Sequence, residues 1–276
     1  MALILVGMDE AGFGPLLGPM CVASSTWRVE GWERGGKAPD LWSLLKAGVC
    51  RKPEARGRIA VADSKKLKLA NERTKPGAET ARARAARHPL MHLERGVLAM
   101  VDALGWDASS DEALLASLGA RAGCHPCYGG EAIALPLCAS SDARGIAANF
   151  LRVAMSRGGA VVSDVRCETV DETAFNAIIE RTGNKAEVSV ETFGRLVSRA
   201  VGRFAGAAEE GDCLRIVCDR LGGRASYGDV LARWFPACED GDIVVVHESE
   251  SLSRYVVHCR SGENGGQEIG VSFEVE

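Results

Sequence analysis

The sequence predicts an α/β protein with a mixed β-sheet flanked by helices. Short apolar runs typical of buried strands occur near both ends of the chain, at residues 2–9 and 214–219. Between these runs, residues 160–167 have the pattern of a strand, and residues 171–181 and 189–207 have the pattern of helices. This alternation of strands and helices is typical of α/β domains, in which helices cover the faces of the sheet.

The remaining elements follow from periodicity and from turn residues. Residues 19–28 alternate small, apolar and polar side chains, the pattern of a second strand after a tight connection. Apolar residues three and four positions apart predict a helix over 40–49. Further strands are predicted at 58–62, 243–248, 253–259 and 268–276, and further helices at 88–104, 110–122, 145–156 and 227–235.

Length and composition exclude several classes of protein. The 276 residues suffice for one large domain or a domain with a substantial insertion, and a mean hydropathy of −0.01 is typical of globular proteins. No apolar run approaches the roughly 18 residues that a membrane-spanning helix needs. Asp9 and Glu10 interrupt the N-terminal apolar run too early for a signal peptide. We therefore expect a cytoplasmic monomer without membrane association.

Positive charge is concentrated in one block of the chain. Residues 51–95 hold 13 basic and 5 acidic residues, a local charge of +8, whereas the rest holds 20 basic and 32 acidic residues, or −12. A solvated helix face would account for part of this block. A polyanion such as nucleic acid is the natural partner of the rest of it.

Two adjacent carboxylates stand where the first predicted strand gives way to a glycine-rich turn. Asp9 and Glu10 precede a turn that contains Gly12, Gly14 and Gly18. Glycine has no Cβ, so such a turn allows the backbone to approach a ligand closely. Carboxylates at this place suit hard cations such as Mg²⁺ or Mn²⁺. The alternative is an exposed acidic turn with no ligand.

Two segments resemble those of a known family. Residues 7–15, Gly-Met-Asp-Glu-Ala-Gly-Phe-Gly-Pro, followed by Gly18-Pro19, resemble the N-terminal signature of the type 2 ribonucleases H, the ribonuclease HII family. The segment Asp63-Ser64-Lys65-Lys66-Leu67 is similar to a second family motif, in the same order and at a similar spacing. The resemblance is clear over residues 1–70 and weaker over 160–235. It implies a ribonuclease-H-like mixed sheet and hydrolysis of the RNA strand of RNA·DNA hybrids by a two-metal mechanism.

The same resemblance suggests how the chain is divided. The family has no segment comparable to residues 76–150, so we expect a helical insertion there. Residues 1–75 and 151–276 would then form the N-terminal and C-terminal parts of the ribonuclease-H-like domain. The chain ends on a strand-like segment without the family's closing helix, which suggests that the C-terminal part is truncated.

The family holds its metal ions with four carboxylates. Asp9 and Glu10 match the first two directly, and Asp219, at the end of an apolar run, is the best match to the third. The fourth is open: Glu276 or Glu274 at the end of the last strand is favoured slightly over Glu248. The predicted catalytic and metal-binding set is therefore Asp9, Glu10, Asp219 and Glu276.

The resemblance also implies a set of substrate-binding residues. Lys65 and Lys66 would contact the nucleic-acid backbone as point charges, and the hydroxyl of Ser64 could add a contact to phosphate. Gly12, Phe13 and Gly14 occupy the family's Gly-Arg-Gly segment, whose backbone reads the ribose at an RNA–DNA junction.

Phe13 departs from the family pattern because the arginine and its phosphate contact are lost. The family's C-terminal tyrosine has no obvious counterpart either, so junction specificity is not implied. A ribonuclease-H-fold protein that binds nucleic acid but is catalytically impaired is the alternative function.

Ten cysteines are scattered along the chain. Several of them lie in strand-like runs where a free cysteine behaves as a small buried apolar residue: Cys21, Cys213, Cys218 and Cys259. Cys124 and Cys127 form the only Cys-x-x-Cys pair, and no second ligand pair with matching spacing is evident. A structural loop is favoured there over a metal or redox site.

Overall fold

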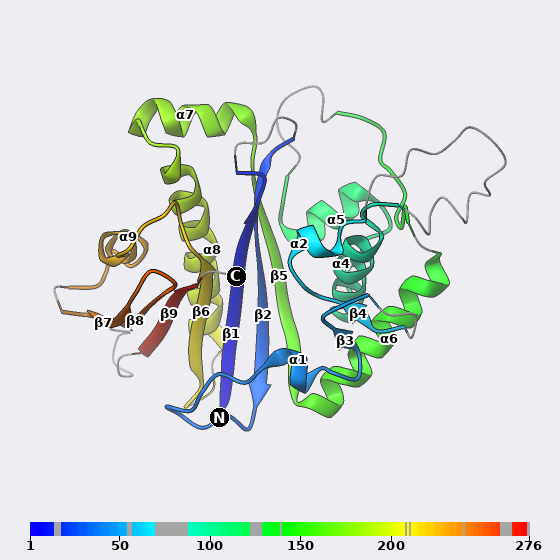
Figure 1. Cartoon of the computed structure of the whole chain (residues 1–276), viewed down its shortest axis with the longest axis horizontal. Helices are drawn as coiled ribbons and strands as arrows, with labels where there is room; N and C mark the ends of the chain where they lie inside the picture. Colours follow the sequence, from blue (N-terminus) through cyan, green and yellow to red (C-terminus); the bar gives the residue numbers. More distant parts are fainter. Residues whose placement is uncertain are drawn as a thin grey trace. The chain divides into compact units, whose positions relative to one another are not determined.

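A seven-stranded β-sheet forms the framework of the first of two compact units (Figure 1). Its strand order is β5-β2-β1-β6-β9-β8-β7. The strands are β1 (Ala2–Ala11), β2 (Met20–Glu30), β5 (Ala160–Val170), β6 (Cys213–Asp219), β7 (Ile243–Glu248), β8 (Leu252–Cys259) and β9 (Gln267–Glu274). The computed structural model describes residues 1–13, 18–53, 57–69, 88–121, 129–138, 140–207, 209, 211–239, 241–259 and 267–274.

The sheet is mixed, as predicted. β1 runs antiparallel to β2 and parallel to β6, and β6 runs parallel to β9. β8 runs antiparallel to both β9 and β7. Strands and helices alternate around this sheet, which confirms the α/β class and is compatible with the ribonuclease-H-like fold that the resemblance implies.

One face of the sheet carries the main apolar core. Along β6, Leu214, Ile216 and Cys218 are buried while the residues between them are half-buried, because successive side chains of a strand point to opposite faces. Their side chains pack in one cluster with an apolar stripe of the long helix α8 (Ala186–Ala207), which includes Phe193 and Leu196. Each fully buried side chain of this kind contributes about 1.5–3 kcal/mol, so the core holds α8 against the sheet.

Local signals set the ends of the helices near this core. The side chain of Asp171 caps α7 (Glu172–Thr182) by accepting a hydrogen bond from the Ala174 N–H at 2.8 Å. Gly183 ends the helix with a φ of +67°, a backbone conformation that favours glycine. A further helix beside this core, α9 (Gly228–Trp234), buries Leu231 and Trp234 in the same apolar cluster.

A second compact unit comprises residues 37–118 and 130–162, and the first comprises 1–36, 119–129 and 163–276. The second unit contains a two-stranded parallel sheet of β3 (Val49–Cys50) and β4 (Ile59–Ala60). Its helices are α1 (Leu41–Leu44), α2 (Ser64–Leu67), α4 (Met91–Ala103), α5 (Asp111–Leu118) and α6 (Ser141–Gly158).

These units are defined by contacts in space and do not follow the predicted boundaries at residues 75 and 150. Residues 37–69, expected with the N-terminal part, belong to the second unit. The reason is that β4 and α2 pack against α4, and α1 packs against α6. Part of the predicted insertion, residues 76–87, lies outside the described residues.

The predicted helices in this unit differ in length from those in the structure, and α1 and α6 show the reasons. The helix expected over 40–49 spans only Leu41–Leu44, because the chain turns into β3. At Gly48 a Cβ atom would lie 2.6 Å from the Phe150 carbonyl oxygen, so α6 approaches the backbone there too closely for a side chain. Conversely, α6 begins at Ser141 rather than 145, since the Ser140 hydroxyl caps it by accepting from the Ala143 N–H.

Among the helices of the described segments, none has the length and apolar character required to cross a lipid bilayer.

Candidate metal centre

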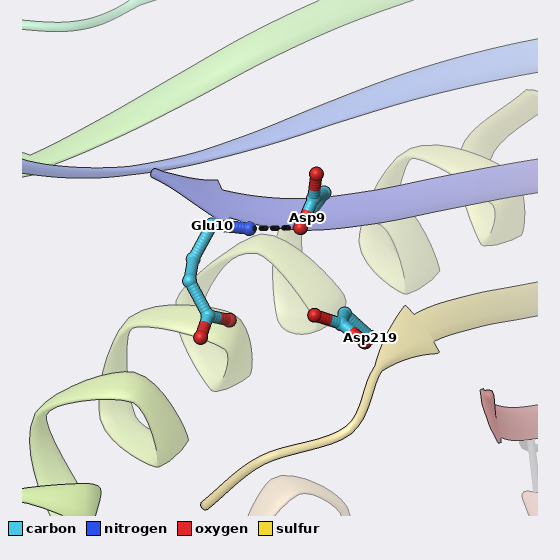
Figure 2. A group of neighbouring side chains, drawn as sticks. All are labelled: Asp9, Glu10 and Asp219. Atoms are coloured by element: carbon cyan, nitrogen blue, oxygen red, sulfur yellow. Dashed lines mark hydrogen bonds between the residues drawn. The ribbon is translucent and has the colours of Figure 1, made fainter. Parts of the chain in front are cut away.

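The register of β1 against β6 brings three carboxylates together at one edge of the sheet. Met8 pairs with Cys218 in the parallel ladder, so the carboxyl ends of both strands reach the same edge. Asp9 and Glu10 follow Met8, and Asp219 follows Cys218. One carboxylate oxygen from each of the three residues lies within 4.8 Å of the others (Figure 2).

Strand alternation places two of the three side chains on one side of the sheet and the third on the other, at the ends of β1 and β6. Met8 and Cys218 are buried in the core, so Asp9 and Asp219 lie on the opposite side of the sheet from it. Glu10 lies on the core side at the end of β1, and its side chain turns toward the other two in Figure 2. Asp9 is exposed and the other two carboxylates are half-buried.

Main-chain hydrogen bonds orient two of the carboxylates. The Glu10 N–H donates to Asp9 Oδ1, and the Arg220 N–H donates to Asp219 Oδ1, both at 2.7 Å. The chain after β6 turns sharply at Gly222 and Gly223, whose φ angles are +62° and +70°. The backbone therefore holds Asp9 and Asp219 in place.

The pKa of the Glu10 carboxyl reflects its burial and the closeness of the other two carboxylates. Burial, and then the negative charges of Asp219 and Asp9, raise the pKa of the Glu10 carboxyl from 4.5 to about 7. Its Oε2 atom is buried and has no hydrogen-bond partner among the described residues. A divalent cation would satisfy this oxygen and offset the repulsion, so the donor set fits Mg²⁺ or Mn²⁺, which prefer oxygen ligands.

The predicted fourth carboxylate, Glu276, lies outside the described residues, but its two alternatives are described. Glu274 is the register partner of Asp219 on β9, the neighbouring parallel strand. Glu248 ends β7 and accepts a hydrogen bond from the Tyr255 hydroxyl. Within the described part of the chain neither joins the cluster of three, although Glu274 is on the strand next to it.

The glycine-rich turn is described only at its ends. Gly12 has a φ of +79°, which confirms that a glycine is needed where the chain leaves β1. Phe13 is 40% exposed and packs edge-to-face against Phe175 of α7. Gly14 lies outside the described residues. Phe175 belongs to no sequence motif. Its contact with Phe13 depends on the fold and could not be predicted from the sequence.

The second motif forms a single helical turn in the second unit. Asp63 caps α2 by accepting from the Lys65 N–H at 2.8 Å, and Leu67 is buried beside Cys50 and Ala60. The first and last residues of the motif therefore fold the turn. Ser64, Lys65 and Lys66, the predicted substrate-binding residues, are left exposed.

Cysteines lie in several environments. Cys218 is buried as predicted, whereas Cys21, Cys213 and Cys259 are only half-buried. Cys21 shares a hydrogen bond with Cys167 of the neighbouring strand β5, which lowers the pKa of Cys21 to about 7 and raises that of Cys167. The predicted loop with Cys124 and Cys127 lies outside the described residues.

Comparison of the chain with protein-family models, with curated proteins and with solved structures found no match.

Proposed function

We propose that this protein is a metal-dependent endonuclease that hydrolyses the RNA strand of RNA·DNA hybrids. The observation that supports it most directly is the convergence of Asp9, Glu10 and Asp219, whose carboxylate oxygens lie within 4.8 Å of one another. The substrate class comes from the resemblance of residues 7–19 and 63–67 to the ribonuclease HII family. We propose a cytoplasmic monomer, as the sequence predicts.

Each group of residues has a separate task in this proposal. Asp9, Glu10 and Asp219 would hold Mg²⁺ or Mn²⁺, and when bound the ions supply activation of a water molecule and stabilisation of the leaving oxygen. The main-chain N–H groups that donate to Asp9 and Asp219 keep these carboxylates oriented before substrate arrives. Lys65 and Lys66 would bind phosphates of the substrate as point charges.

A cleavage assay tests the proposal. A hybrid oligonucleotide labelled on its RNA strand is incubated with the full chain in Mg²⁺, in Mn²⁺ or in EDTA, beside single-stranded RNA and a DNA duplex of the same sequence. We expect cuts within the RNA of the hybrid, in the presence of either metal, and none in EDTA. Cleavage that persists in EDTA, or that is equal on all three substrates, contradicts the proposal.

A second candidate is a nucleic-acid-binding protein that lacks efficient catalysis. It is favoured by Phe13, which replaces the family's arginine, and by a described cluster of three carboxylates rather than four. Nanomolar to micromolar binding of the hybrid without cleavage in either metal supports this candidate over the first.

A further inference from the structure

Three residues after Glu10, an aromatic ring and a lysine come together on the surface of the first unit. The ring centroids of Phe13 and Phe175 are 6.5 Å apart, and the ring planes make an angle of 62°. The Nζ atom of Lys185 lies over the Phe13 ring, 4.5 Å from its centroid, and 6.0 Å from that of Phe175. We call these three residues the aromatic–lysine surface.

The charge of Lys185 is available to a ligand. Lys185 is the only lysine in the sequence of the first unit, and its side chain is exposed. Within the described segments its ammonium group forms no ion pair, and its side-chain contacts are with the two rings. A cation–π contact at an exposed site holds the side chain in place, at about 0.5–1 kcal/mol, without neutralising its charge.

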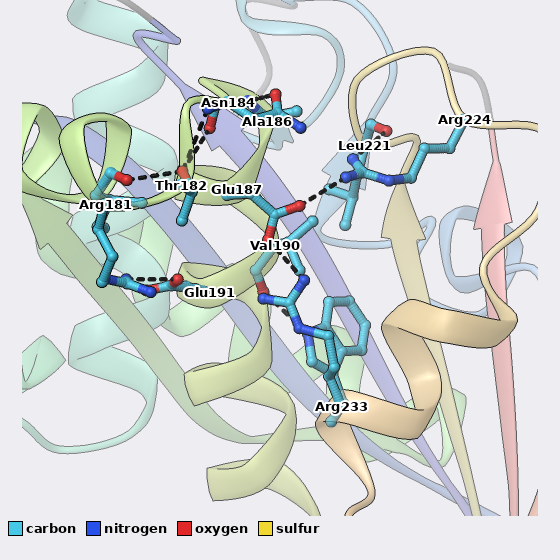
Figure 3. A network of polar contacts seen from close by, with 12 residues as sticks. Arg181, Thr182, Asn184, Ala186, Glu187, Val190, Glu191, Leu221, Arg224 and Arg233 are labelled. Atoms are coloured by element: carbon cyan, nitrogen blue, oxygen red, sulfur yellow. Dashed lines mark hydrogen bonds and ion pairs between the residues drawn. The ribbon is translucent and has the colours of Figure 1, made fainter.

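Arginines near this lysine already have anionic partners (Figure 3). Arg181 donates to both carboxylate oxygens of Glu191, at 2.7 and 2.9 Å. Arg224 and Arg233 bind the two oxygens of Glu187, at 2.9 and 2.6 Å. These three guanidinium groups are paired with carboxylates, whereas the ammonium group of Lys185 has no ion pair within the described segments and can meet an anion from outside.

Such a surface is needed beside an acidic cluster that acts on a polyanion. Three carboxylates repel a phosphodiester strand, and a fixed cation close by offsets that repulsion. An exposed aromatic ring adds a neutral apolar face against which a sugar of the backbone can pack. Phe13 is 40% exposed although Lys185 lies over its ring.

We propose that Phe13, Phe175 and Lys185 form a contact surface for the nucleic-acid strand that enters the metal centre. Lys185 binds a phosphate, and the exposed part of the Phe13 ring packs against the adjoining sugar. Phe175 supports Phe13 from the side. This inference rests on the proposed function and adds Phe175 and Lys185, which lie outside the two family motifs, to its substrate contacts.

Binding measurements on the full chain test this contact. A fluorescein-labelled RNA·DNA hybrid is titrated by anisotropy at several salt concentrations, with Ca²⁺ in place of Mg²⁺, and a gel shows that the oligonucleotide stays intact. The variants are Lys185→Ala, Lys185→Arg, which keeps the charge, and Phe13→Leu, which keeps apolar bulk without an aromatic ring. Arg199→Ala is the charge-matched control, about 20 Å further along α8.

We expect Lys185→Ala to weaken binding about fivefold and to reduce the slope of log Kd against log salt by about one. Lys185→Arg keeps most of the affinity. Phe13→Leu weakens binding about fivefold without changing the slope, because the contact of the ring with a sugar is not ionic. Arg199→Ala binds as the wild type does, and all variants keep the wild-type melting temperature.

Two results overturn the inference in distinguishable ways. If the wild type binds and cleaves the hybrid while Lys185→Ala and Phe13→Leu bind equally well, the aromatic–lysine surface is not a contact, and the proposed function stands. A loss in Arg199→Ala as large as that in Lys185→Ala has the same meaning. If the wild type binds no hybrid, the proposed function and the inference both fail.

Discussion

The two segments that resemble the ribonuclease HII family end up in different structural situations. The first, at residues 7–19, lies at the end of a central strand in the first unit, where the fold adds Asp219 to Asp9 and Glu10. The second, at 63–67, forms one helical turn in the second unit, with Ser64 and two lysines exposed. Long-range strand pairing builds the first site, whereas the second is a single helical turn capped by its own Asp63.

The largest effect is expected at the first segment. Asp9→Asn removes one negative ligand, and the loss of several kcal/mol of transition-state stabilisation lowers the rate of hybrid cleavage by at least about 10³-fold. The exposed carboxylate of Asp229, in the first turn of α9, provides the control Asp229→Asn. Equal cleavage rates for both variants, measured under single-turnover conditions, would remove Asp9 from the metal centre.

A matched pair of substitutions tests which residue supplies the fourth carboxylate of this centre. Glu274 is the register partner of Asp219, whereas Glu248 is engaged with Tyr255. We expect Glu274→Gln to lower cleavage about 10- to 100-fold, the range found when a group next to metal ligands is lost. Glu248→Gln leaves the rate unchanged, since the amide oxygen still accepts from Tyr255. The reverse order of the two rates would assign the fourth carboxylate to Glu248.

At the second segment the expected effect is on binding alone. The double variant Lys65→Ala/Lys66→Ala weakens hybrid binding about tenfold and reduces the salt slope by about two, because two phosphate contacts are lost. Both side chains are exposed, so the melting temperature stays unchanged. Lys46→Ala/Arg157→Ala removes the same charge from the same unit. Equal losses in the two double variants would show a general charge effect rather than a site.

The smallest effect concerns stability and pH. The pKa of Glu10 is raised from 4.5 to about 7, so the folded protein binds this proton more tightly than the unfolded chain. Its contribution to the free energy of unfolding is therefore intact below pH 4.5, is lost as the pH rises to about 7, and is constant above. Because the side chain is partly exposed, we expect a loss of about 1 kcal/mol rather than the full shift.

The glutamine side chain of Glu10→Gln is uncharged at every pH, so this variant tests the pH-dependent loss of stability directly. In EDTA its melting temperature exceeds that of the wild type at pH 8 and equals it at pH 4.5. Excess Mg²⁺ at pH 8 raises the melting temperature of the wild type more than that of the variant. If the melting temperatures of Glu10→Gln and the wild type differ by the same amount at both pH values, the raised pKa of Glu10 does not cause that difference.

Periodicity predicts each strand of the main sheet and nearly every helix, because buried faces impose their spacing on the sequence. It does not predict that residues 37–69 join the second unit, since the contacts of α1 with α6 and of α2 with α4 are non-local. Asp9 and Glu10 are visible as a pair in the sequence. The interaction of Phe13 with Phe175 and Lys185 is not, because it depends on where α7 ends and α8 begins.

The position of β1 in the sheet has a consequence for synthesis of the chain. Every residue of β1 from Ala2 to Ala11 has a partner on β2, so this hairpin can form early. The other edge of β1 receives its parallel partner only when Cys213–Asp219 has been translated. Until then an apolar strand edge is open to pairing with other chains. Nascent chains that stall before β6 are therefore expected to be the form most prone to aggregation.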